Sequence, residues 1–63
     1  MSKRDEAKSA KLHMREAKKY AHVAKEKLEE IGDKETARKC ERIEKAAEAV
    51  EEEISDKLDP QKG

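Results

Sequence analysis

Apolar and small residues recur along the first half of the chain at alternating intervals of three and four residues. The positions that follow this pattern are Ala7, Ala10, Met14, Ala17, Ala21, Ala24, Leu28 and Ile31. Because an α-helix completes a turn in about 3.6 residues, this spacing places their side chains along one stripe of a helix. Such a heptad repeat is typical of helices that pack against other helices. The pattern therefore predicts a helix over residues 3–31.

The ends of this helix carry capping signals. Ser2 can accept a hydrogen bond from the free backbone N–H groups of the first turn, and Asp5 can reach back to it, as in a capping box. Gly32 can adopt the left-handed conformation that ends many helices. Asp33 follows directly and is a typical N-cap for a new helix. A stop and a start in adjacent residues predict a tight turn at 32–33 and two antiparallel helices.

The same spacing continues after the turn. The positions that carry it are Cys40, Ile43, Ala47, Val50 and Ile54. They predict a second helix over residues 34–58. Pro60 disfavours helical geometry at Asp59, so residues 59–63 are expected to form a tail outside the helix. The whole chain, 1–63, is predicted to be a single helical-hairpin domain.

Folding the chain about Gly32 should place core positions opposite each other where their residue numbers add up to about 64. The predicted pairs are Ala24 with Cys40, Ala21 with Ile43, Ala17 with Ala47, Met14 with Val50, and Ala10 with Ile54. Most of these layers combine a small residue with a larger one, which lets two helices approach closely.

This predicted core is thin. Seven of its thirteen positions are Ala or Cys. Burying an alanine methyl contributes about 0.8 kcal/mol, whereas ordering one residue costs about 1.5 kcal/mol. Two helices that share such a core cannot offset the cost of ordering the chain. We therefore predict an all-α fold in which the antiparallel helical hairpin forms a homodimeric four-helix bundle. The alternative is a single, partly disordered hairpin.

Charged residues make up 51% of the chain, yet the net charge is zero. Residues 1–25 contain eight Lys/Arg and three Asp/Glu, while residues 44–59 contain two and seven. Antiparallel folding brings these stretches together, so we expect the charges to neutralise each other rather than to form a nucleic-acid face. No apolar run approaches the roughly 20 residues that cross a membrane, and the N-terminus has no hydrophobic secretory segment. These features predict a cytoplasmic protein without membrane contact.

The residues that could carry chemistry are few. His13 and His22 are nine positions apart, so they point in opposite directions on one helix and cannot share a metal ion. Cys40 is the only cysteine and has no histidine opposite it in the predicted alignment, which favours a packing role. No phosphate-binding loop, nucleophile elbow or zinc-ligand spacing is present. We therefore expect no enzyme activity and no cofactor or metal site.

Three apolar side chains of the first predicted helix lie outside the predicted core: Leu12, Tyr20 and Val23. They share a helix with several basic residues, namely Lys8, Arg15, Lys18, Lys19 and Lys27. A mixed basic and apolar face of this kind could dock a protein or an RNA phosphate backbone.

The sequence resembles the Rop family without gaps along nearly its whole length. The resemblance is densest near the turn, in Glu26-Lys27-Leu28-x-Glu30-Ile31, Glu35-x-Ala37 and Cys40-Glu41-x-Ile43, and continues at Ala47 and Val50. Proteins of this plasmid-encoded family are helical hairpins that dimerise into antiparallel four-helix bundles and bind pairs of kissing RNA hairpins. The resemblance implies a dimeric bundle. It also implies candidate RNA contacts at Lys8, Arg15, Lys18 and Lys27.

Two hypotheses follow. The first is a small dimeric helical-bundle module for interaction or structure, without catalysis, whose partner is a second copy or another protein. The alternative is a Rop-like RNA-binding regulator of plasmid copy number, whose partner is structured RNA. Glu16 stands where the family has its RNA-contacting phenylalanine, and its charge would repel phosphate. This difference and the zero net charge favour the first hypothesis. Both the syn and the anti arrangement of the two hairpins stay open.

Overall fold

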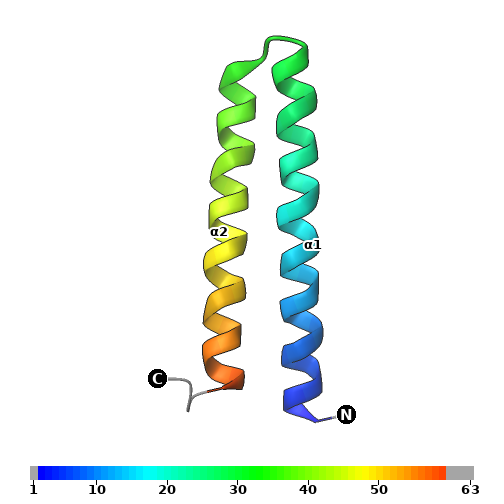
Figure 1. Ribbon diagram of the computed structural model, residues 1–63, viewed down its shortest axis with the longest axis vertical. Helices are drawn as coiled ribbons and strands as arrows, with labels where there is room; N and C mark the ends of the chain where they lie inside the picture. The colour runs from blue at the N-terminus through cyan, green and yellow to red at the C-terminus, as the bar shows by residue number, and fades with distance from the viewer. Residues whose placement is uncertain (1, 60–63) are drawn as a thin grey trace.

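The computed structural model describes residues 2–59 and consists of two α-helices joined by a tight turn (Figure 1). Helix α1 spans Lys3–Glu30 and helix α2 spans Lys34–Leu58. The helices lie side by side and run in opposite directions, and Arg4 Nη1 donates a hydrogen bond to the carbonyl oxygen of Leu58 at 3.2 Å. The predicted all-helical hairpin is confirmed. The part of the predicted tail at 60–63 lies outside the described residues.

Helix α1 is capped at both ends. Ser2 Oγ accepts a hydrogen bond from the backbone N–H of Asp5 at 3.1 Å, as its N-cap position predicted. The sequence placed the end of the helix at Ile31, which is the C-cap in the structure. Gly32 follows with a positive φ of 81°. Its N–H bonds to the carbonyl of Glu29 at 3.1 Å, and the next N–H bonds to that of Leu28 at 2.9 Å. These two bonds form a Schellman motif, which satisfies carbonyls that the helix end leaves free.

Helix α2 begins at the predicted cap. Asp33 Oδ1 accepts a hydrogen bond from the backbone N–H of Thr36 at 3.1 Å. Hydrogen bonds from Thr36 hold the pKa of the Asp33 carboxyl below its ordinary value, and the positive charge of Lys39 acts in the same direction. At the other end, Asp59 leaves helical geometry with φ −134° and ψ 69°, as expected for a residue before proline.

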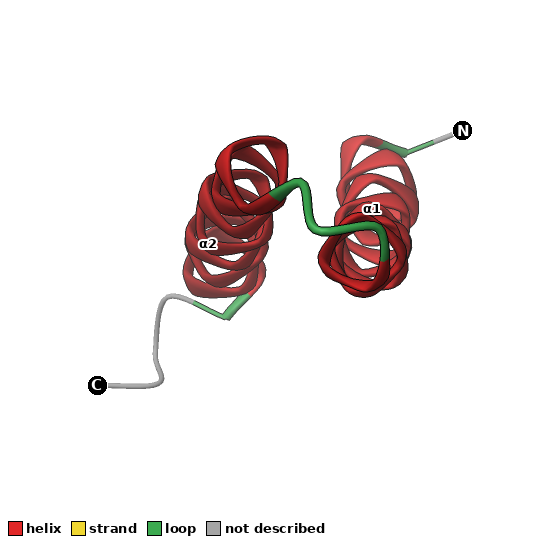
Figure 2. Ribbon diagram, turned by 90° about the horizontal axis from the view of Figure 1, so that it is seen from above, coloured by secondary structure: helices red, strands yellow, loops and turns green. Residues whose placement is uncertain are grey.

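The hairpin is a single layer of two helices. Its dimensions are 44 × 26 × 11 Å, so its thickness is that of one helix. The view from above shows the two helices beside each other in this layer (Figure 2). Among residues 2–59 the buried apolar side chains are those of Ala21, Ala37 and Ala47. The core of one hairpin is therefore three alanine methyls with half-buried neighbours.

The residues predicted to form the bundle core divide into three groups in the hairpin. Ala21 and Ala47 are buried; Ala7, Met14, Ala24, Leu28, Cys40 and Ile54 are half-buried; Ala10, Ala17, Ile31, Ile43 and Val50 are exposed. Ala21 was paired with Ile43 in the predicted alignment, yet 53% of Ile43 is exposed. The helices therefore face each other with only part of the predicted apolar stripe.

Ala37 is buried, although the heptad pattern did not include it. It begins a row at intervals of seven that continues through Glu44 and Glu51 to Leu58, and the later members of this row are all half-buried. Because two members of the row are charged, the apolar spacing did not indicate it as a contact surface. On α1, Lys18 and Lys25 are half-buried and pair with Glu48 and Glu41 of α2.

Candidate functional site

Ion pairs join the two helices along one side of the hairpin. Their partners are Arg15 with Glu51 (3.1 Å), Lys18 with Glu48 (3.6 Å), His22 with Glu44 (2.8 Å) and Lys25 with Glu41 (3.6 Å). Each step of three or four residues along α1 is matched by an equal step back along α2. These residues form what we call the ion-paired face. It joins basic residues of α1 to acidic residues of α2, as the charge pattern predicted. It also fixes the register: the residue numbers of each pair add up to 66, two more than in the predicted alignment.

The ion-paired face contributes modestly to stability. The side chain of Arg15 is 61% exposed and that of Lys18 is 44% exposed, so solvent screens both charges. Exposed pairs of this kind typically contribute between 0 and about 1 kcal/mol each. Their main physical effect is therefore to select one register among several that the small alanine contacts would allow.

The opposite side of the hairpin is apolar and exposed. Going round α1 from the buried Ala21, His22 and Lys25 lie on one side, while Tyr20 and Ala24 lie on the other, because each residue advances the helix by about 100°. The row through Ala24 contains Ala10, Ala17 and Ile31 at intervals of seven. Ile31 is 76% exposed.

Helix α2 continues this surface. Around α2 from the buried Ala47, Glu44 and Glu48 lie toward the ion-paired face, and Ile43 and Val50 lie toward the other side. Both isoleucine and valine are exposed. We call the combined surface the apolar face; it consists of Ala10, Ala17, Ala24, Ile31, Ile43 and Val50.

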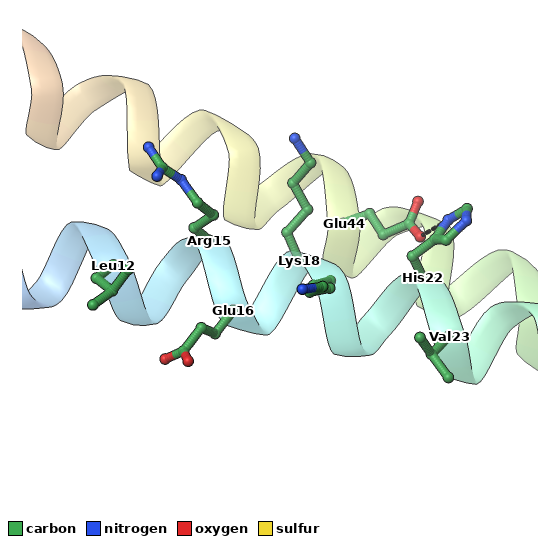
Figure 3. Close-up of a pocket in the computed structure, with 8 residues that line it drawn as sticks. Leu12, Arg15, Glu16, Lys18, His22, Val23 and Glu44 are labelled. Atoms are coloured by element: carbon green, nitrogen blue, oxygen red, sulfur yellow. Dashed lines mark hydrogen bonds and ion pairs between the residues drawn. The ribbon is translucent and has the colours of Figure 1, made fainter.

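A groove of about 750 Å³ lies on the outer side of α1 (Figure 3). Its lining residues are Leu12, Arg15, Glu16, Lys18, Lys19, His22, Val23 and Glu44. Arg15, Lys18 and His22 extend toward α2, whereas Glu16 and Val23 point away from it. The groove thus combines apolar surface from Leu12 and Val23 with basic groups that the ion-paired face already engages.

The candidate RNA contacts do not form one surface. Lys8, Arg15 and Lys18 lie on the side of α1 that carries the ion-paired face, but Lys27 lies on the other side, in the row of Tyr20. Arg15 and Lys18 are engaged with glutamates of α2, and Glu16 lines the groove beside them. The carboxylates reduce the positive potential that phosphate would meet.

The two histidines contact different groups. His13 Nδ1 lies 2.8 Å from the carbonyl oxygen of Ser9, and His22 Nδ1 lies 2.8 Å from Glu44 Oε1. Within residues 2–59 no three His, Cys, Asp or Glu side chains gather as they would around a metal ion. Cys40 is a half-buried free thiol at the contact between the helices. Over the same part of the chain, neither helix has the length and apolar character needed to cross a membrane.

The exposed apolar face was the feature that sequence reasoning located only in part. The heptad pattern identified the residues of this face but assigned them all to the core. It did not distinguish core residues that lie between the two helices from residues that stay exposed on one side of the hairpin. Comparisons with protein-family models, with curated proteins and with solved structures found no match to this chain.

Proposed function

We propose that this chain is a homodimeric interaction module without catalysis, in which two hairpins pack apolar face against apolar face as a four-helix bundle. The observation that carries the proposal is the exposure of Ile31, Ile43 and Val50 beside a core of three buried alanines. Small domains bury a small share of their surface, so one with a thin core gains stability from a staple or a partner. Covering this face would supply the missing apolar burial.

A second copy fits the apolar face in shape. The face has a row of alanines on α1 and a row of larger residues on α2, so each layer of a four-helix bundle would contain both small and large side chains. The hairpin presents a surface 44 Å long and 26 Å wide.

A second copy also fits the apolar face in charge. The net charge of the chain is zero, so two copies do not repel each other at long range. The ion-paired face points away from the apolar face on both helices. In the proposed bundle both ion-paired faces and both grooves therefore stay on the outside, where a further partner can reach them.

Sedimentation equilibrium at micromolar concentration tests the proposal. We expect the mass of a dimer and a melting temperature that rises with protein concentration. Ile43→Glu should shift the protein to monomer and reduce its helix content. Leu12→Glu is a matched control, because Leu12 is also 53% exposed in the hairpin but lies outside the apolar face. A wild-type monomer at these concentrations would refute the proposal.

The alternative function is that of a Rop-like RNA-binding regulator of plasmid copy number. Lys8, Arg15 and Lys18 on one side of α1 favour it, and Glu16 opposes it. It predicts a complex with kissing RNA hairpins whose affinity falls steeply as salt rises. Substituting Arg15 and Lys27 with alanine should weaken that complex more than Lys45→Ala. The absence of a mobility shift at low salt would exclude it.

A further inference from the structure

Two rows of residues border the apolar face. On α1 the bordering row is His13, Tyr20 and Lys27, and on α2 it is Lys39, Ala46 and Glu53, each at intervals of seven. All of these residues are exposed in the hairpin. When another helical layer covers the apolar face, these border residues come next to the border residues of that layer.

The ion pairs give the level of each border residue along the hairpin. Lys25 pairs with Glu41, so two residues further on Lys27 lies level with Lys39. In the same way, the pairing of Lys18 with Glu48 places Tyr20 level with Ala46. The pairing of Arg15 with Glu51 places His13 level with Glu53.

Two copies can cover each other's apolar faces in two symmetric ways. In the first, the two-fold axis runs parallel to the helices and both turns lie at the same end. Every residue keeps its level, and α1 lies over α2 of the second copy. Lys27 then faces Lys39 of the second copy, and His13 faces its Glu53. Symmetry produces the like-charge contact between the lysines twice.

In the second way, the axis crosses the helices and the turns lie at opposite ends. Helix α2 then lies antiparallel to α2 of the second copy. With the axis at the level of Ala46, Lys39 faces Glu53 of the second copy, again twice, and on α1 His13 faces Lys27 of the second copy. The same register places Ile43 against Val50 of the second copy. On α1 it places Ala17 against Ala24 of the second copy.

We infer that Lys39 and Glu53 determine how the second copy docks, and that they select the bundle with its turns at opposite ends. This inference rests on the proposed homodimer. The selection combines an attraction between Lys39 and Glu53 with the avoidance of contact between Lys27 and Lys39.

A double-mutant cycle on the dimer dissociation constant tests the inference. Lys39→Glu and Glu53→Lys should each weaken the dimer by about tenfold, and the double variant should recover most of the loss. Residues 39 and 53 are roughly 21 Å apart along one helix, so they cannot couple within a chain. Coupling between them therefore reports contact between copies. A dimer that Lys39→Glu tightens, or a cycle without coupling, would overturn the inference.

Spin labels measure the arrangement directly. Lys3→Cys in a Cys40→Ser background places one label at the start of α1. Turns at opposite ends put the two labels roughly 50 Å apart, whereas turns at the same end put them roughly 20 Å apart. Short distances in a dimer would contradict the inference but leave the proposed function intact. A monomer in sedimentation would remove both.

Discussion

Arg15 on α1 forms an ion pair with Glu51 on α2, with Nε and Oε2 3.1 Å apart. The glutamate side chain is only 17% exposed, whereas the arginine side chain is 61% exposed. The two partners of this pair are therefore unequal. Removing the arginine leaves a largely covered negative charge, while removing the glutamate leaves a solvated cation.

We expect Arg15→Ala to lower the free energy of unfolding by about 1 kcal/mol, at the upper end for partly exposed pairs. Arg15→Lys should recover part of the loss, because lysine keeps the charge but not the fixed geometry of the guanidinium. Urea denaturation at a fixed protein concentration measures both. Lys45→Ala removes an exposed cation whose partner is Glu41 and is the control. Equal effects of Arg15→Ala and Lys45→Ala would show that Glu51 gains nothing from its partner.

The turn depends on Gly32. Its φ of 81° lies in the left-handed region, and a Cβ added there would meet nothing within 4 Å. Gly32→Ala should therefore cost only the backbone strain, about 1–2 kcal/mol. Gly32→Asn should cost less, because asparagine tolerates this conformation better. Thermal unfolding of the three proteins at one concentration checks the order. An alanine variant as stable as the wild type would contradict it.

Asp33 makes stability depend on pH in the acidic range. Its folded-state pKa is lowered from 3.8 by the hydrogen bonds from Thr36. A lowered pKa means that the folded state favours the carboxylate, so this contribution is fully present above pH 3.8 and is lost as pH falls through the folded-state pKa.

Asp33→Asn isolates this contribution, because asparagine is an equally good N-cap but does not titrate. Both proteins lose stability in acid as their many other carboxylates protonate. We expect the wild type to lose more stability than the variant as the pH falls below 3.8, as followed by circular dichroism. Parallel pH profiles would show that the cap does not depend on the charge.

The close approach of the helices depends on small residues at their contact. Ala47 is 2% exposed, so a larger side chain there has no free space. Ala47→Leu should destabilise the hairpin by about 1–3 kcal/mol through overpacking. Ala49→Leu is the matched control, because Ala49 is exposed on the same helix. Chemical denaturation compares the two, and a neutral Ala47→Leu would mean that the helices can separate at no cost.

The helices and the turn could be predicted because their signals are local. Ser2, Gly32 and Asp33 carry their conformational preferences within a few residues, and each occupies the cap or turn position that the sequence indicated. Asp59 leaves the helix for an equally local reason, the proline that follows it.

The faces of the helices could not be predicted in the same way. A heptad stripe shows which residues avoid water, but it does not show which of them meet the neighbouring helix of the hairpin. Ala37 was missed because it shares its row with Glu44 and Glu51. Those glutamates lie at the contact because cations of α1 pair with them. This pairing of charges can be recognised only when the register of the two helices is known.

A layer one helix thick has no interior common to its two sides. Side chains of the ion-paired face and of the apolar face lie on opposite sides of the buried Ala21 and Ala47, and they point in different directions. Substitutions on opposite faces should therefore change the free energy of unfolding additively. Each side can then be altered by mutation without readjustment of the other.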